Sequence, residues 1–154
     1  MEKTLVALKP DAVRKGLQDE IKNRLTATGL KIVAEKEMQV DATFASEHYS
    51  DLGIRKGEDV KRRMVTFLSS GPVITMIIEG ENAIEEVRRI VGKTLPADAD
   101  VGTIRGDLGD REESYAKADE ADRAVENLIH ASDAPETAAA EIKLWFPELD
   151  SREW

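Results

Sequence analysis

The chain has 154 residues and no cysteine, and its 31 acidic and 22 basic side chains give a formal net charge of -9 and a sequence pI near 4.8. A chain of this length can bury roughly two thirds of its unfolded surface, so we expect residues 1–154 to form a single domain. The lack of cysteine excludes disulfides and thiolate metal sites, and the negative charge excludes a general surface for nucleic acids or anionic membranes.

Apolar patterning predicts four strands with helices between them. The first strand ends at Pro10, and the strongest strand, at 73–79, is rich in β-branched residues. Apolar residues recur every four positions between Leu17 and Leu25, which favours a helix that ends near Gly29. In chain order we expect strands at 3–9, 32–40, 73–79 and 128–129, and helices at 17–25, at 43–69 in two pieces, at 82–93 and from 134, with a long loop over 94–124.

This order of elements is typical of an α+β protein with the ferredoxin-like split βαβ fold. It predicts a four-stranded antiparallel sheet covered by helices, which we expect to lie on one face. Because this architecture carries many unrelated functions, the function has to come from motifs. The sequence contains neither a P-loop nor a Gly-x-Gly-x-x-Gly motif, so nucleotide phosphates would have to be held by side-chain cations.

The most informative segment is 127–133, Asn-Leu-Ile-His-Ala-Ser-Asp, which places a histidine among hydroxyl and carboxylate groups and precedes Glu136 and Glu141. Imidazole titrates near neutrality and is a nucleophile that forms covalent intermediates. His130 is therefore a candidate nucleophile, although a lone histidine at a strand end is more often a hydrogen-bonded core or surface residue. We expect His48, the other histidine, to lie on a short surface helix with no functional neighbours.

Four motifs follow one another along the chain: Lys9-Pro10-Asp11, Ser70-Gly71-Pro72-Val73, Pro96-Ala97-Asp98 with the run from Gly102 to Asp107, and the segment 127–133. In this order they resemble the motifs of the nucleoside diphosphate kinases, in which a histidine takes a phosphoryl group from one nucleotide and gives it to another. The resemblance implies transfer of the γ-phosphate of ATP or another nucleoside triphosphate to a nucleoside diphosphate, by a ping-pong mechanism through a phosphohistidine on His130. The alternative is a catalytically silent ferredoxin-like module that binds nucleotides or regulates a partner.

The resemblance also assigns the residues of the site. Glu141 and Ser132 would orient the histidine, since a carboxylate that accepts from the ring fixes its tautomer. Mg²⁺ would be held by the nucleotide phosphates, with Asp133 contacting it through water. Spacing from the Ser-Gly-Pro motif favours Arg88 over the adjacent Arg89. The matched nucleotide-binding positions are Lys9, Tyr49, Val60, Arg88, Thr94, Arg105 and Asn127.

Two departures from the family pattern concern the nucleotide cleft. Val60 stands where the family usually has an aromatic residue that stacks on the base, and the preceding segment 51–59 is about three residues longer than usual. An insertion of about twelve residues falls within 110–121 and includes Tyr115. The insertion either reshapes the nucleotide cleft or pads a subunit edge, and Tyr115 is a second candidate for the base contact.

The expected partners are nucleoside tri- and diphosphates and further copies of the chain, because the resemblance implies a homo-oligomer, either a tetramer or a hexamer. We expect no specific nucleic acid and no membrane partner, since the apolar runs are too short to span a bilayer. The start of the chain lacks the basic and apolar build of a signal peptide, so we expect a cytoplasmic protein.

Overall fold

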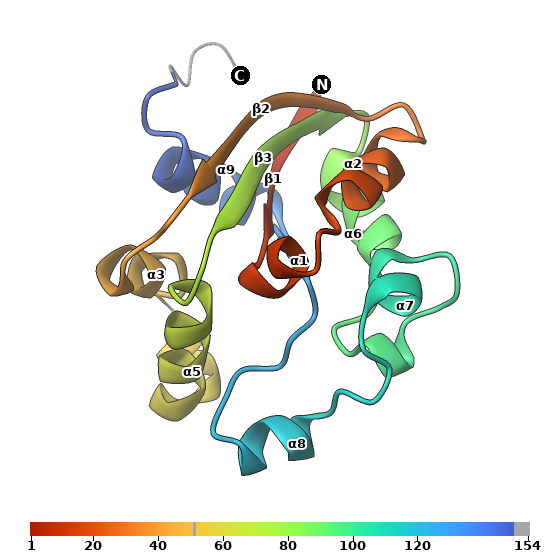
Figure 1. Cartoon of the computed structure of the whole chain (residues 1–154). Coiled ribbons are helices and arrows are strands. Elements are labelled where there is room, and N and C mark those ends of the chain that lie inside the picture. The colour runs from red at the N-terminus through yellow and green to blue at the C-terminus, as the bar shows by residue number, and fades with distance from the viewer. Residues whose placement is uncertain (51, 150–154) are drawn as a thin grey trace.

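A four-stranded antiparallel sheet forms the centre of the molecule (Figure 1). The computed structural model describes residues 1–50 and 52–149; Asp51, the first residue of the segment expected to be lengthened, lies outside them. The strands lie in the order β2-β3-β1-β4, which confirms the predicted ferredoxin-like fold. Their bounds are Glu2–Leu8 for β1, Lys31–Met38 for β2, Val73–Gly80 for β3 and Ile129–Ala131 for β4.

The inner strands β1 and β3 are mostly buried. β3 is buried without interruption from Val73 to Ile78, whereas β2 alternates between exposed and partly buried residues at the edge of the sheet. The short strand β4 pairs with β1, which brings His130 opposite Ala7. Because β1 is buried from Thr4 onward, this pairing fixes the candidate nucleophile against the centre of the sheet.

The described helices are shorter and more numerous than the sequence pattern predicts. The pair expected over 43–69 is three helices, with Gly57 in a left-handed conformation (φ 97°) directly before the third. The loop expected over 94–124 contains three short helices. The bounds are Pro10–Arg14 for α1, Gln18–Thr26 for α2, Ala42–His48 for α3, Leu52–Lys56 for α4, Glu58–Leu68 for α5, Ala83–Val91 for α6, Pro96–Asp98 for the 3-10 helix η1, Ile104–Leu108 for α7, Tyr115–Glu120 for α8 and Pro135–Trp145 for α9.

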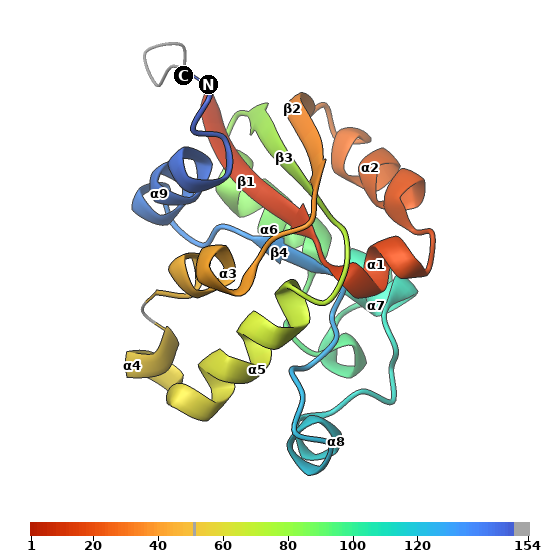
Figure 2. The ribbon, with the colours of Figure 1, turned by 60° about the vertical axis from the view of Figure 1, so that its left-hand side comes forward.

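Helices cover both faces of the sheet, so the expectation of cover on one face is wrong. Alternate residues of β1 point to opposite sides: Val6 and Leu8 pack with α2 and α6, whereas Leu5 and Ala7 pack with α3, α5 and α9. Figure 2 shows α3 and α9 on one side of the sheet and α2 on the other. Strands that are apolar on both sides need cover on both faces. None of the described helices is long and apolar enough to cross a bilayer.

Candidate active site

His130 lies in the middle of β4 and lines a cavity of about 680 Å³. Its Nε2–H donates a hydrogen bond of 2.9 Å to Glu141 Oε1, because a carboxylate can only accept. In the neutral ring the proton is then on Nε2, and the lone pair is on Nδ1. The hydrogen bond therefore selects Nδ1 as the nucleophilic atom.

Glu141 is itself held by Ser132, so the predicted orienting pair and the histidine come together. The Ser132 hydroxyl donates to Glu141 Oε1 at 2.6 Å. Ser132 is fully buried, and its backbone N–H donates to the carbonyl of Leu5 on β1 at 3.1 Å. The carboxylate on α9 is thus tied to the sheet by the residue that follows β4.

The prediction for His48 is wrong, because this residue is buried beside the candidate nucleophile. Its side chain is 1% exposed, and its ring centroid lies 4.5 Å from that of His130, with the two planes at 82°. The indole N–H of Trp145 donates to His48 Nδ1 at 3.0 Å. Burial, helped by the nearby charges of His130 and Lys9, holds the pKa of His48 well below its usual range. The His48 ring is therefore neutral and carries its proton on Nε2.

His48, His130 and Glu141 also place possible metal-ligand atoms within 4.8 Å of one another. However, His48 Nδ1 accepts from Trp145, and His130 Nε2 donates to the carboxylate. A metal ion between these atoms would break both hydrogen bonds and leave the buried indole N–H without a partner, which is costly. This geometry favours a hydrogen-bond network over a metal centre.

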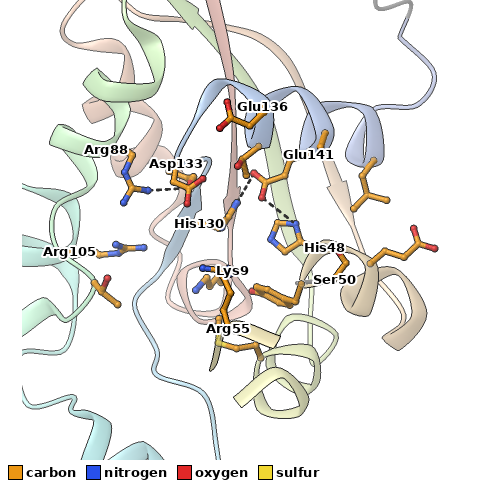
Figure 3. Close-up of a pocket in the computed structure, with 18 residues that line it drawn as sticks. Lys9, His48, Ser50, Arg55, Arg88, Arg105, His130, Asp133, Glu136 and Glu141 are labelled. Carbon is orange, nitrogen blue, oxygen red and sulfur yellow. Dashed lines mark hydrogen bonds and ion pairs between the residues drawn. The ribbon is translucent and has the colours of Figure 1, made fainter. Parts of the chain in front are cut away.

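Cationic side chains surround the space next to the nucleophile, as Figure 3 shows for Lys9, Arg88 and Arg105. The sequence pattern missed several lining residues, among them Ser50 and Arg55 from the region of α3 and α4. Most of the predicted site residues line this one cavity: Lys9, Tyr49, Arg88, Thr94, Arg105, His130, Asp133 and Glu141.

Lys9 follows β1 directly and is 4% exposed. Its ammonium donates to Asn127 Oδ1 at 2.8 Å, and its backbone N–H donates to the carbonyl of Leu128 at 2.8 Å. Burial, together with the positive charge of Arg105, lowers the pKa of Lys9 to about 8, although Asp11 opposes the shift. A fully charged Lys9 is therefore costly unless an anion occupies the cavity beside it.

Arg105, at the start of α7, joins its helix to the catalytic strand. Its guanidinium donates to the carbonyls of Asn127 at 3.1 Å, Gly92 at 3.2 Å and Ile129 at 2.5 Å. Burial, and after it the charge of Arg88, lowers the pKa of Arg105 to about 10, so the group is a cation at neutral pH. Arg88 makes a longer bond of 3.4 Å to the carbonyl of the residue after the histidine. Two guanidinium groups thus reach the end of β4 from different helices.

Asn127 is buried beside the cavity and is not one of its lining residues. Its amide oxygen accepts from Lys9, and its amide N–H donates to the carbonyl of Thr94 at 2.9 Å. Tyr49 is 8% exposed, and burial, with the negative charge of Glu141, raises the pKa of its phenol. The hydroxyl of Tyr49 therefore stays protonated and available as a donor.

Val60 lies outside the cavity, on α5, with 37% of its surface exposed. Met64, one turn further along the same helix, lines the cavity. Residues four positions apart share one helix face, so Val60 lies on the side of α5 that includes the cavity wall. Its contact with a nucleotide base stays a prediction.

The segment 110–121, which we expect to be an insertion, makes hydrogen bonds with Arg123, two residues after its end, and with α5. Glu113 is 4% exposed and accepts two hydrogen bonds from Arg123, at 2.5 and 2.9 Å. Arg63 of α5 donates to Asp119 of α8 at 2.7 Å. No described residue of this segment lines the cavity, so its role, either in the nucleotide cleft or at a subunit edge, stays a prediction.

A histidine beside Lys9, Arg88 and Arg105 in one cavity is an arrangement that fits a phosphotransferase. The family model for nucleoside diphosphate kinase matches residues 2–151. A nucleoside diphosphate kinase of Methanocaldococcus jannaschii is 44% identical over 147 residues, which cover 96% of this chain and 94% of the relative. One of Methanothermobacter thermautotrophicus is 46% identical over 150 residues, 97% of this chain and 90% of the relative.

A solved structure of the nucleoside-diphosphate kinase of Borrelia burgdorferi, a transition-state mimic with bound vanadate and ADP, superposes with a TM-score of 0.91. It is 39% identical, and the match covers 99% of this chain and 89% of that one. An NDP kinase of Pyrobaculum aerophilum superposes with a TM-score of 0.87 at 38% identity, over 94% of this chain and 95% of that one. The chain therefore belongs to the nucleoside diphosphate kinase family.

Proposed function

We propose that this chain transfers the γ-phosphate of a nucleoside triphosphate, such as ATP, to a nucleoside diphosphate through a phosphohistidine on His130. The observation that carries the proposal is the hydrogen bond from His130 Nε2–H to Glu141, because it leaves the Nδ1 lone pair available in a cavity lined by Lys9, Arg88 and Arg105. Membership of the kinase family supports the same reaction.

In the first half-reaction, Nδ1 attacks the γ-phosphorus, and the bond from that phosphorus to the β–γ bridging oxygen breaks. The nucleoside diphosphate leaves with the electron pair, and the phosphorylated ring becomes a cation that Glu141 stabilises through Nε2–H. In the second half-reaction, a terminal oxygen of another nucleoside diphosphate attacks the same phosphorus. The N–P bond then breaks and returns the neutral ring, so one nucleophile serves donor and acceptor in turn.

The cations of the cavity would stabilise the charge that spreads over the equatorial oxygens of the transferring phosphoryl group. We assign this role to Lys9, Arg88 and Arg105, with Tyr49 and Thr94 donating from their hydroxyls to the phosphates. Asn127 would contact the ribose. Its amide oxygen accepts from Lys9 and keeps a second lone pair for that contact.

The residues that line the cavity fit a Mg²⁺ ion that arrives bound to the nucleotide phosphates. The cavity lining holds four cations and four carboxylates, and Asp133 is an exposed carboxylate on its wall. When bound, Mg²⁺ neutralises charge on the phosphates. We propose that Asp133 accepts hydrogen bonds from the water around this ion.

We further propose that residues 1–154 act as one domain of a cytoplasmic homo-oligomer, either a tetramer or a hexamer. The proposed nucleotide substrates support the cytoplasmic location. The edge strand β2 supports assembly, because its outer backbone groups can pair with another strand and its Val33 is 46% exposed. Sedimentation equilibrium would give the number of copies.

The proposal is tested by exposing the chain to ATP labelled either at the γ- or at the α-phosphate. We expect the γ-label alone to remain on the protein, in an acid-labile and base-stable bond, and to leave on addition of a nucleoside diphosphate. His130→Ala should fold normally, take up no label and show no turnover. A catalytically silent module would take up no label even as the wild-type chain, and label on His130→Ala would remove His130 from its role.

A further inference from the structure

Leu128, two residues before the nucleophile, has a left-handed backbone conformation with φ at 74°. Its side chain is 1% exposed, so this residue is part of the core. The left-handed region is unfavourable for residues with a side chain such as leucine, because Cβ comes too close to the following carbonyl oxygen. Such residues persist where surrounding contacts fix them, and they gather at functional sites.

The residues that follow β1 hold Leu128 on both sides. Asp11 Oδ2 accepts from the Leu128 N–H at 3.0 Å, and the Lys9 N–H donates to the Leu128 carbonyl at 2.8 Å. Asp11 is fully buried, and its Oδ1 has no hydrogen-bond partner among the described residues. Burial raises the pKa of Asp11, whereas the charge of Lys9 and the hydrogen bond from the Leu128 N–H oppose this shift, so the buried carboxylate depends on partners that lie beside the nucleophile.

The residues on either side of Leu128 belong to the active site. Asn127 accepts from the ammonium of Lys9, and its carbonyl accepts from Arg105. The carbonyl of Ile129 also accepts from Arg105, and His130 comes next. A rotation of the Leu128 backbone would therefore displace the nucleophile relative to Lys9 and Arg105.

We propose that Asp11 is a positioning residue for phosphoryl transfer: it holds Leu128 in the left-handed conformation and so sets His130 in place relative to Lys9 and Arg105. The inference rests on the proposed role of His130. Asp11 lies behind the reacting atoms, and its effect passes through the backbone of Leu128. Asp11 also acts on Lys9 through its negative charge. The test therefore has to separate the effect of this charge from the effect of the hydrogen bond to Leu128.

Two substitutions separate the hydrogen bond from the charge. Asp11→Asn keeps an oxygen that accepts from the Leu128 N–H, whereas Asp11→Leu has a similar size and no acceptor. We expect Asp11→Leu to lower kcat about 100-fold, the cost of a misplacement near 1 Å. Asp11→Asn should stay within about tenfold of wild type, because a neutral acceptor makes a weaker bond than a charged one. Asp19→Leu removes the same charge from an exposed position on α2 and should match wild type.

Phosphorylation of His130 by a donor without a nucleoside, phosphoramidate, distinguishes a misplaced nucleophile from a weakened nucleotide site. We expect its rate to fall in Asp11→Leu by the same factor as kcat, while KM for ATP changes little. An unchanged phosphoramidate rate in folded Asp11→Leu would overturn the proposal. An equal loss in Asp11→Asn and Asp11→Leu would also overturn it, since the charge alone would then matter.

Should Asp11→Leu fail to fold, the wild-type protein and Asp11→Asn still decide the matter by amide NMR. We expect the Leu128 amide proton of the wild type to resonate downfield, to exchange slowly with solvent, and to move upfield in Asp11→Asn. A rapidly exchanging Leu128 amide in the wild type would overturn the inference. Failure of the proposed function itself is recognised separately, because the wild-type chain would then take up no phosphoryl group at all.

Discussion

Lys9 is an ammonium group whose burial brings its titration close to neutral pH. Burial and Arg105 lower the pKa of Lys9 to about 8, so the positive charge is present below that pH and is lost above it. The ratio kcat/KM reports groups of the free enzyme. We therefore expect kcat/KM for ATP to fall about tenfold per pH unit above about pH 8.

The matched control for this pH profile is Lys9→Arg. A guanidinium keeps its charge around pH 8, so the inflection there should disappear even where the absolute rate is lower. Initial rates measured with ATP and a nucleoside diphosphate over about pH 6 to 9, below the pKa of Arg105, give both curves. A wild-type profile that stays flat to the upper end would contradict a role for the Lys9 charge.

Single residues differ in how far sequence determines their roles. His130, Glu141 and Lys9 were predicted from motifs and their order along the chain, and all three line the same cavity. His48 was missed, although its spacing from Phe44 on α3 places it on the apolar helix face, which was a usable signal. The left-handed Leu128 leaves no such signal, because its conformation depends on a hydrogen bond to Asp11, 117 positions away.

Among the helices, α5 leads to a prediction about the affinity for nucleotides. Val60 lies one turn before the cavity residue Met64 on this helix. Stacking of a base on an aromatic ring contributes about 1 to 3 kcal/mol, and an aliphatic contact keeps only part of it. Because this contact is made equally before and during transfer, Val60→Phe should lower KM by roughly one decade and leave kcat nearly unchanged.

The effect of Val60→Phe should be larger for purine than for pyrimidine nucleotides, whose smaller rings gain less contact. Val60→Leu enlarges the side chain without adding a ring and serves as the control in the same KM measurements. Unchanged KM values in Val60→Phe would mean that this face of α5 does not meet the base. Tyr115 of α8, which is 55% exposed, would then be the next residue to replace.

The elements that sequence predicted best are those whose patterns are local. β3 is rich in β-branched residues, and α6 has apolar residues at helical spacing. The short helices α7 and α8 have too few turns for a periodic pattern, and they begin at side-chain caps instead. Thr103 accepts from the N–H of Gly106 at 3.0 Å, and Ser114 accepts from that of Lys117 at 3.1 Å. Caps of this kind are visible in the sequence, but without periodicity they did not suffice to predict a helix.

Across the whole molecule, 31 acidic side chains outnumber 22 basic ones and give a formal net charge of -9. Excess carboxylates repel one another, and salt screens this repulsion. Salt also weakens surface ion pairs such as Lys22 with Glu35, but exposed pairs contribute little. We therefore expect the melting temperature to rise between dilute buffer and about 1 M potassium chloride.

Calorimetry or circular dichroism would measure this salt effect, and a chain with less negative charge is the natural control. The double variant Glu37→Gln with Glu85→Gln neutralises two exposed acids away from the cavity and should gain less from salt. A wild-type melting temperature that stays constant or falls as salt is added would contradict the screening argument.

The contact of Trp145 with His48 has a spectroscopic consequence. The indole donates a hydrogen bond to a neutral imidazole that packs against the ring of His130, so a phosphoryl group on His130 alters the electric field at the indole. The chain has two tryptophans, and Trp154 lies outside the described residues. With Trp154 replaced by phenylalanine, all tryptophan fluorescence comes from Trp145. The emission of one native side chain would then follow each half of the catalytic cycle in real time, without a coupled enzyme or a radioactive nucleotide.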